Sequence, residues 1–154
     1  MFHQCFILTE QERNVENKSE KKFNGYIFFD YECMTSENSH VPNLIVVDKV
    51  CCDCLDEKIC QNNCKIHKFT SNDEFCLWLL QQDYYIAIAH NLRAYDGVFI
   101  MKYLTQNPIP KEKISVLLSG TKLITIQVQN VKIIDSFNYI HMSLAKFPAT
   151  FQIQ

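Results

Sequence analysis

The chain has 154 residues, of which 47% are hydrophobic and 21% are charged, and its formal net charge is −2. This length suits one domain with a real core, and the composition excludes a disordered or collagen-like chain. No apolar run reaches the roughly 18 residues that a membrane span needs, and the first residues lack the features of a signal peptide. We therefore expect a globular intracellular protein with no membrane partner.

The predicted elements mix strands with helices. Residues 1–22 include a long polar stretch and are predicted to be flexible, so the ordered domain is expected to begin near Phe23. Ser71 followed by Glu74 forms a capping box, which is typical of a helix start. In chain order, we expect a turn at 24–25, strands over 26–34 and 40–50, a helix over 70–82, a strand over 83–91, a helix over 94–107, and strands over 122–128 and 131–137. Such a mixture predicts an α/β layer domain.

Two acids, Asp30 and Glu32, lie within the first predicted strand. Side chains alternate along a strand, so these carboxylates share one face at a spacing of about 7 Å and repel each other. A hard divalent cation such as Mg²⁺ or Mn²⁺ would relieve that repulsion. The alternative is a solvated strand end, because Asp-x-Glu is common by chance. A third carboxylate, Asp96, begins the helix after the strand over 83–91, and three such acids are typical of a two-metal phosphoryl-transfer site.

Five of the eight cysteines fall within residues 51–64. The spacing of a Cys-x-x-Cys pair and a following Cys-x-x-His pair is typical of a structural zinc site with four ligands. The candidate ligands are Cys51, Cys54, Cys64 and His67. Cys60 is an alternative to His67 for the fourth place, and a loop with free thiols is the rival interpretation. We therefore treat residues 51–67 as a candidate zinc loop.

Two stretches carry a family resemblance: "FFDYE" and the later "AHNLRAYDGVFI". They resemble the first two exonuclease motifs of B-family DNA polymerases, above all the protein-primed branch of bacteriophages, linear plasmids and Maverick (Polinton) transposons. The family's first motif is Asp-x-Glu, and its second is Asn, two or three residues, an aromatic residue and Asp. The stretches "HVPNLIVV" and "IDSFNYIHMSLAKFPATF" are also similar to this family, so the resemblance covers residues 23–154.

The resemblance implies a ribonuclease H-like 3′–5′ exonuclease domain, which is the proofreading part of a DNA polymerase. It implies that Asp30, Glu32 and Asp96 hold two Mg²⁺ or Mn²⁺ ions and are the catalytic carboxylates. It also implies that Asn91 and Tyr95 hold the 3′ end of single-stranded DNA.

A further motif of the family, Ser/Thr-Leu-x-x-hydrophobic, contacts single-stranded DNA and the terminal (priming) protein. The resemblance places Ser136 and Phe137 at its first two positions and Ile140 at its last. Phe137 departs from the family's leucine.

The family's third exonuclease motif, Tyr-x-x-x-Asp, supplies another metal-binding Asp. No such pattern follows residue 96. We therefore expect a partial domain, an amino-terminal fragment of a polymerase with weak or no activity by itself. Two alternatives stay open: a non-catalytic DNA-binding or zinc-containing remnant of a transposon polymerase, and an independent metal-dependent nuclease.

Overall fold

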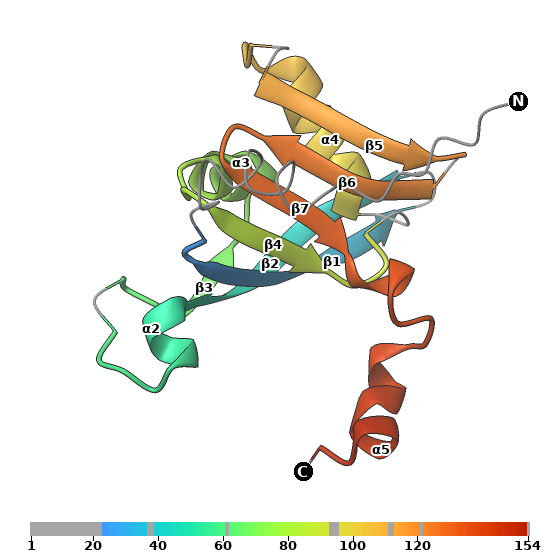
Figure 1. The fold of residues 1–154 in the computed structure, drawn as a ribbon. Helices are drawn as coiled ribbons and strands as arrows, with labels where there is room; N and C mark the ends of the chain where they lie inside the picture. Colours follow the sequence, from blue (N-terminus) through green and yellow to red (C-terminus); the bar gives the residue numbers. More distant parts are fainter. Residues whose placement is uncertain are drawn as a thin grey trace, which may run out of the picture.

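A seven-stranded mixed sheet in the order β3-β2-β1-β4-β7-β6-β5 runs through the computed structural model of this protein (Figure 1). The structure describes residues 23–36, 39–60, 62–92, 96–110, 113–120 and 122–153. The predicted flexible segment over 1–22 lies outside these residues. The strands are β1 (Gly25–Ser36), β2 (Ser39–Cys51), β3 (Ile66–Phe69), β4 (Tyr85–Ala89), β5 (Ile114–Ser119), β6 (Lys122–Val128) and β7 (Val131–Asp135). The helices are α2 (Cys52–Leu55), α3 (Asn72–Leu80), α4 (Asp96–Gln106) and α5 (Phe147–Phe151), with 3-10 turns η2 (Ser136–Asn138) and η3 (Leu144–Lys146).

Three parallel strands form the centre of the sheet. β1 pairs with β4 from Gly25 opposite Tyr85 to Phe28 opposite Ile88, and β4 pairs with β7 in the same direction. The outer strands are antiparallel to their neighbours. Because the three central strands run the same way, their carboxyl ends lie at one edge of the sheet, which is where α/β sheets commonly bind ligands.

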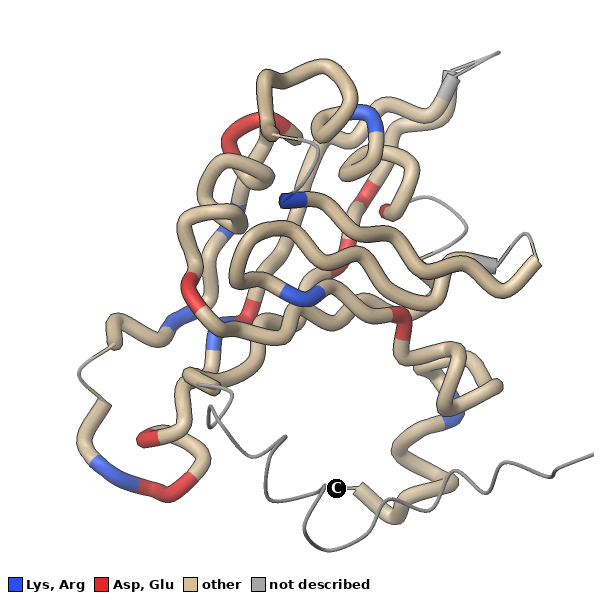
Figure 2. Tube along the Cα trace, turned by 45° about the horizontal axis from the view of Figure 1, so that its top comes forward, with Lys and Arg blue, Asp and Glu red and all other residues tan. Residues whose placement is uncertain are grey.

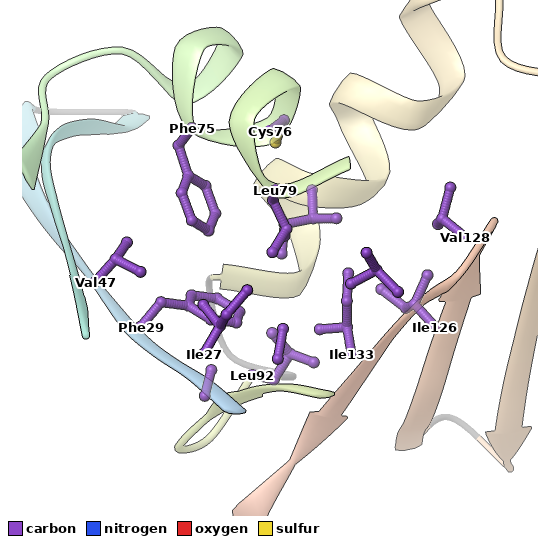
Figure 3. Close-up of a cluster of buried hydrophobic side chains, with 14 of the residues drawn as sticks. Ile27, Phe29, Val47, Phe75, Cys76, Leu79, Leu92, Ile126, Val128 and Ile133 are labelled. Carbon is purple, nitrogen blue, oxygen red and sulfur yellow. The ribbon is translucent and has the colours of Figure 1, made fainter. Parts of the chain in front are cut away.

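The core lies between the sheet and helices α3 and α4. Figure 3 shows Phe75 and Leu79 of α3 pointing toward strand residues such as Ile27, and all three are at most 1% exposed. Burial of apolar side chains of this size contributes about 1.5–3 kcal/mol each. None of the described helices is long and apolar enough to cross a membrane.

The structure confirms the α/β class and most predicted elements. Ser71 caps α3 as predicted, because its Oγ accepts a hydrogen bond from the Glu74 backbone N–H at 3.4 Å. The strand predicted over 131–137 ends earlier, at Asp135, where the chain turns into η2. Sequence analysis did not anticipate β3 and β5, because β3 has only four residues and β5 is a mostly exposed edge strand with no clear alternation.

The predicted turn at 24–25 is instead the start of β1. Gly25 has φ +145 and lies opposite Cys51, and a Cβ there would overlap the Val50 carbonyl oxygen. The glycine is therefore required by the close approach of β2 and by its backbone conformation, not by a hairpin.

Candidate functional site

The two acids of β1 lie on the face opposite to the core. Ile27, Phe29 and Tyr31 are buried, whereas Asp30 and Glu32 are exposed, so the predicted alternation is confirmed. A β-bulge follows Glu32, a distortion that often redirects side chains beside functional sites. Partial burial and then the charge of Glu32 raise the pKa of Asp30. The repulsion expected from the sequence is therefore present in the fold.

The third predicted acid, Asp96, is the first residue of α4 and is 6% exposed. Burial, followed by the charges of Asp30 and Asp135, raises its pKa to about 7. The pKa of the Cys33 thiol is likewise raised, first by burial and then by the charges of the three candidate acids. The Asp30 carboxylate of β1 therefore acts on Asp96 of α4, although the two residues are 66 positions apart in sequence (96 − 30).

The glycine after Asp96 fits a tight junction between β4 and α4. The Gly97 N–H donates to the Leu92 carbonyl oxygen at 2.7 Å, and a Cβ on Gly97 would lie 2.8 Å from that oxygen. Only glycine therefore fits here without a shift of the backbone, and this tight contact holds the start of α4 close to the end of β4.

A fourth carboxylate, Asp135, was missed by sequence analysis. It is fully buried at the end of β7, and its Oδ1 accepts hydrogen bonds at 2.9 Å from the backbone N–H groups of Asn91 and Phe137. Asn91 has φ +64, an uncommon conformation for a residue other than glycine. The Asp135 side chain thus joins the segment after β4 to the turn after β7. The available signal was a lone acid ending an apolar strand, directly before Ser136.

His90 forms a second connection between the same segments. Its Nε2 lies 2.8 Å from the Met142 carbonyl oxygen, which can only accept, so Nε2 carries a proton. Its Nδ1 lies 2.9 Å from Ser136 Oγ, and the same Oγ lies 3.1 Å from the Ala89 carbonyl oxygen, so the single hydroxyl proton has two acceptors within reach. His90 is therefore a structural link, and it fixes where the Ser136 side chain lies.

A groove of about 590 Å³ opens on the uncovered face of the sheet. Three residues singled out from the sequence, Asp30, Ser136 and Ile140, line it together. Its other walls are mostly apolar and include Phe28, which is 44% exposed. The groove can therefore accept a flat apolar group close to the Asp30 carboxylate.

Other predicted site residues lie differently. Phe137 packs its ring 5.5 Å from that of His90 and 5.5 Å from that of His141, and it is not among the groove residues. Asn91 is exposed. Tyr95 lies outside the residues that the structure describes. The Lys and Arg positions are scattered over the described trace (Figure 2), so positive charge does not mark the groove.

The clearest set of described side chains that could hold a metal ion consists of thiols, not carboxylates. Among the described residues, the ligand atoms of one cysteine cluster lie within 4.8 Å of one another, and the carboxylates form no comparable group. The members of the cysteine cluster are Cys51, Cys54, Cys60 and Cys64. This set could hold a metal such as zinc.

His67 lies outside the cysteine cluster, which corrects the expected ligand set in favour of Cys60. The reason is the pairing of β3 with β2, which places His67 opposite Val47. Its ring packs 4.8 Å from that of Trp78, and its Nε2 is buried without a hydrogen-bond partner. Burial and the nearby lysines lower the pKa of His67.

No protein-family model matches this sequence, and no curated protein matches it. Among solved structures, the fold is similar to phi29 DNA polymerase complexed with primer-template DNA and incoming nucleotide substrates, with a TM-score of 0.62 and 18% identity. It is also similar to phi29 DNA polymerase complexed with single-stranded DNA, with a TM-score of 0.64 and 16% identity. Each match covers 84% of this chain but only 23% or 24% of the polymerase chain. At this level of identity the likeness establishes a shared fold, and the chain spans about a quarter of the length of these structures.

Proposed function

We propose that this chain is part of a protein-primed B-family DNA polymerase and carries its ribonuclease H-like 3′–5′ exonuclease domain. One observation carries the proposal: acids of two separate motifs, Asp30 and Asp96, interact electrostatically at the carboxyl edge of the central strands. The fold likeness to phi29 DNA polymerase supports the same interpretation, because it extends over 84% of this chain.

The groove beside Asp30 is the proposed site for the 3′ end of single-stranded DNA. Its apolar walls and the half-exposed Phe28 offer surfaces on which a base can stack, an interaction that tolerates any base sequence. Asn91 and Tyr95 are proposed to hold the terminal nucleotide. Asp135 would position Asn91, since it binds the backbone N–H of that residue.

Two divalent cations, Mg²⁺ or Mn²⁺, are proposed to bind at Asp30, Glu32 and Asp96. The donor chemistry fits, since carboxylates suit hard cations. Beside burial, the charge of Glu32 raises the pKa of Asp30 and the charge of Asp30 raises that of Asp96, and a bound cation would oppose both effects. When bound, such ions supply charge stabilisation for phosphodiester hydrolysis. The bound cations would also offset the negative charge of Asp30 and Asp48, which line the groove, and so let a phosphate approach it.

The segment after β7 is proposed to contact both DNA and a terminal protein. Ser136 and Ile140 line the groove, whereas Phe137 lies against His90 and His141. The hydroxyl would therefore meet DNA inside the groove, and the terminal protein would approach the same turn from outside.

A 3′–5′ exonuclease assay tests the proposal. Single-stranded DNA labelled at its 5′ end is incubated with Mn²⁺ and either this chain or a version extended through a Tyr-x-x-x-Asp motif. We expect shortening from the 3′ end by the extended chain, its loss in Asp30→Ala, and its retention in Asp73→Asn. Asp73 is a matched control because it is an exposed acid in the first turn of α3, on the other face of the sheet. Undiminished activity of Asp30→Ala would refute the assignment.

The same assay separates the two alternatives. Equal activity of the 154-residue chain and the extended chain would favour an independent metal-dependent nuclease. Binding of single-stranded DNA without hydrolysis by either chain would favour a non-catalytic remnant of a transposon polymerase.

A further inference from the structure

We propose that the cysteine cluster binds one structural Zn²⁺ ion through four thiolates. The ligands are Cys51, Cys54, Cys60 and Cys64. They come from the end of β2, from α2 and from the loop that leads to β3. The inference concerns a site remote from the candidate acids, and it does not depend on the proposed exonuclease function.

The spacing of the sulfur atoms fits coordination of a single ion. The Cys51 Sγ lies 3.7 Å from the Cys54 Sγ and 3.8 Å from the Cys60 Sγ. A tetrahedral Zn²⁺ with Zn–S bonds of about 2.3 Å places its ligand sulfurs about 3.8 Å apart. A disulfide would need about 2.05 Å. The cluster therefore has the dimensions of a zinc site and not of a disulfide pair.

Little apolar packing holds the described part of the loop that carries the cluster, where only Cys54 and Cys64 pack against the core. It joins β2 to β3. Within its described residues, 52–60 and 62–65, α2 is the only regular element, and none of the α2 residues is buried. Its large apolar side chains are exposed, with Leu55 at 49% and Ile59 at 89%. A loop of this length without its own packing needs another source of order, and a structural metal supplies it in small modules.

Local hydrogen bonds favour thiolate ligands within this loop. The Cys51 backbone N–H donates to the Cys64 Sγ at 3.2 Å, an interaction that stabilises a charged sulfur. The neighbouring Cys52 differs, since its Sγ bonds the Phe23 carbonyl oxygen at 3.4 Å and is not in the cluster. The fold thus selects four of the five clustered cysteines.

The proposed ion would fasten the starting ends of the central strands. Cys51 lies opposite Gly25 at the start of β1, and the Cys52 N–H donates to the Asn24 carbonyl oxygen at 3.0 Å. Asn24 in turn donates its backbone N–H to the Tyr84 carbonyl oxygen at 2.9 Å, just before β4. The candidate acids lie toward the opposite ends of these strands, and four protein ligands leave no open coordination position. The ion would therefore be structural and not catalytic.

Metal analysis of the whole chain tests the inference. The protein is purified under reducing conditions without chelator, its zinc is measured by mass spectrometry, and Co²⁺ is then substituted. We expect about one zinc per chain, together with a cobalt spectrum of a tetrahedral site with four thiolates. Reduced wild-type protein that binds no Zn²⁺, or a cobalt spectrum without thiolate charge-transfer bands, would overturn the inference.

Three variants then test the ligand set. Cys60→Ser should weaken Zn²⁺ binding more than 100-fold, beyond the roughly 10–100-fold typical of outer-shell changes. His67→Gln and Cys52→Ser should bind Zn²⁺ as the wild type does, and Cys52→Ser is the matched control from the same loop. Loss of binding in His67→Gln with retention in Cys60→Ser would refute the four-cysteine set. If Cys60→Ser does not fold, the thiolate count from the wild-type cobalt spectrum decides between four cysteines and three.

Discussion

Removal of the Asp135 carboxylate should loosen the edge of the sheet where the candidate site lies. Its Oδ1 is the acceptor for the backbone N–H groups of both Asn91 and Phe137, and the side chain is fully buried. Asp135→Ala deletes this acceptor, whereas Asp135→Asn keeps an oxygen in the same place and removes only the charge. The pair of variants therefore separates hydrogen bonding from electrostatics.

The expected cost follows from the number of N–H groups left without their acceptor. A fully buried donor that loses its partner costs about 1–3 kcal/mol. Both of these bonds are only part-buried, so the lower half of that range applies to each, and Asp135→Ala should lower the free energy of unfolding by roughly 2–4 kcal/mol. Asp135→Asn should cost less than about 2 kcal/mol, since both bonds remain but lose their ionic character. Removing this charge also removes one of the causes that raise the pKa of Asp96, so that pKa should fall below about 7.

Urea unfolding followed by circular dichroism measures the stability difference, and amide hydrogen exchange of Asn91 and Phe137 reports on the two bonds directly. Carboxyl NMR titration follows Asp96. Equal destabilisation by both variants would show that the charge, and not the acceptor, is what matters. A loss of less than about 1 kcal/mol in the free energy of unfolding for Asp135→Ala would refute the argument, because two lost part-buried bonds to a buried carboxylate predict more.

Three further predictions concern stability. Burial raises the pKa of Asp96 from its ordinary 3.8 to about 7 in the fold, so its contribution to stability is present below pH 4 and is lost as pH rises to about 7. In metal-free buffer, the wild type should therefore lose roughly 2–3 kcal/mol of its free energy of unfolding between pH 5 and 8 relative to Asp96→Asn, measured by urea unfolding. Parallel pH profiles of the two proteins would contradict this. Gly25→Ala should lower the free energy of unfolding by more than about 2 kcal/mol, because the new Cβ would overlap the Val50 carbonyl oxygen at a positive φ. A melting temperature close to that of the wild type would argue against that overlap. Ser71→Ala removes the acceptor that caps α3 and should lower the free energy of unfolding by about 1 kcal/mol. Ser71→Asp keeps an acceptor at this position and should retain most of the stability in the same thermal melts.

Patterns local in sequence determined much of the fold. The alternation in β1 predicted that Asp30 and Glu32 share the face opposite to Ile27, and the structure has this arrangement. The capping box predicted where α3 begins. Both depend on residues within a few positions of each other, because strand alternation and helix capping are properties of the backbone near each residue.

Contacts between distant segments were decided only by the tertiary structure. The bond between Asn91 and Asp135 joins residues 44 positions apart, and the link between His90 and Ser136 spans 46. No periodicity in the sequence encodes which buried acid meets which N–H group, because that depends on the order of the strands in the sheet.

The candidate zinc loop, residues 51–67, shows the same division between sequence and tertiary structure. The spacing of its cysteines indicated a metal site, but it favoured His67 as the fourth ligand and left Cys60 as the alternative. Pairing of β3 with β2 decides between them, because it places His67 against Trp78 and leaves Cys60 beside Cys51. Spacing along the chain thus determined which residue types gather in the loop, and the packing of the sheet determined which of them meet.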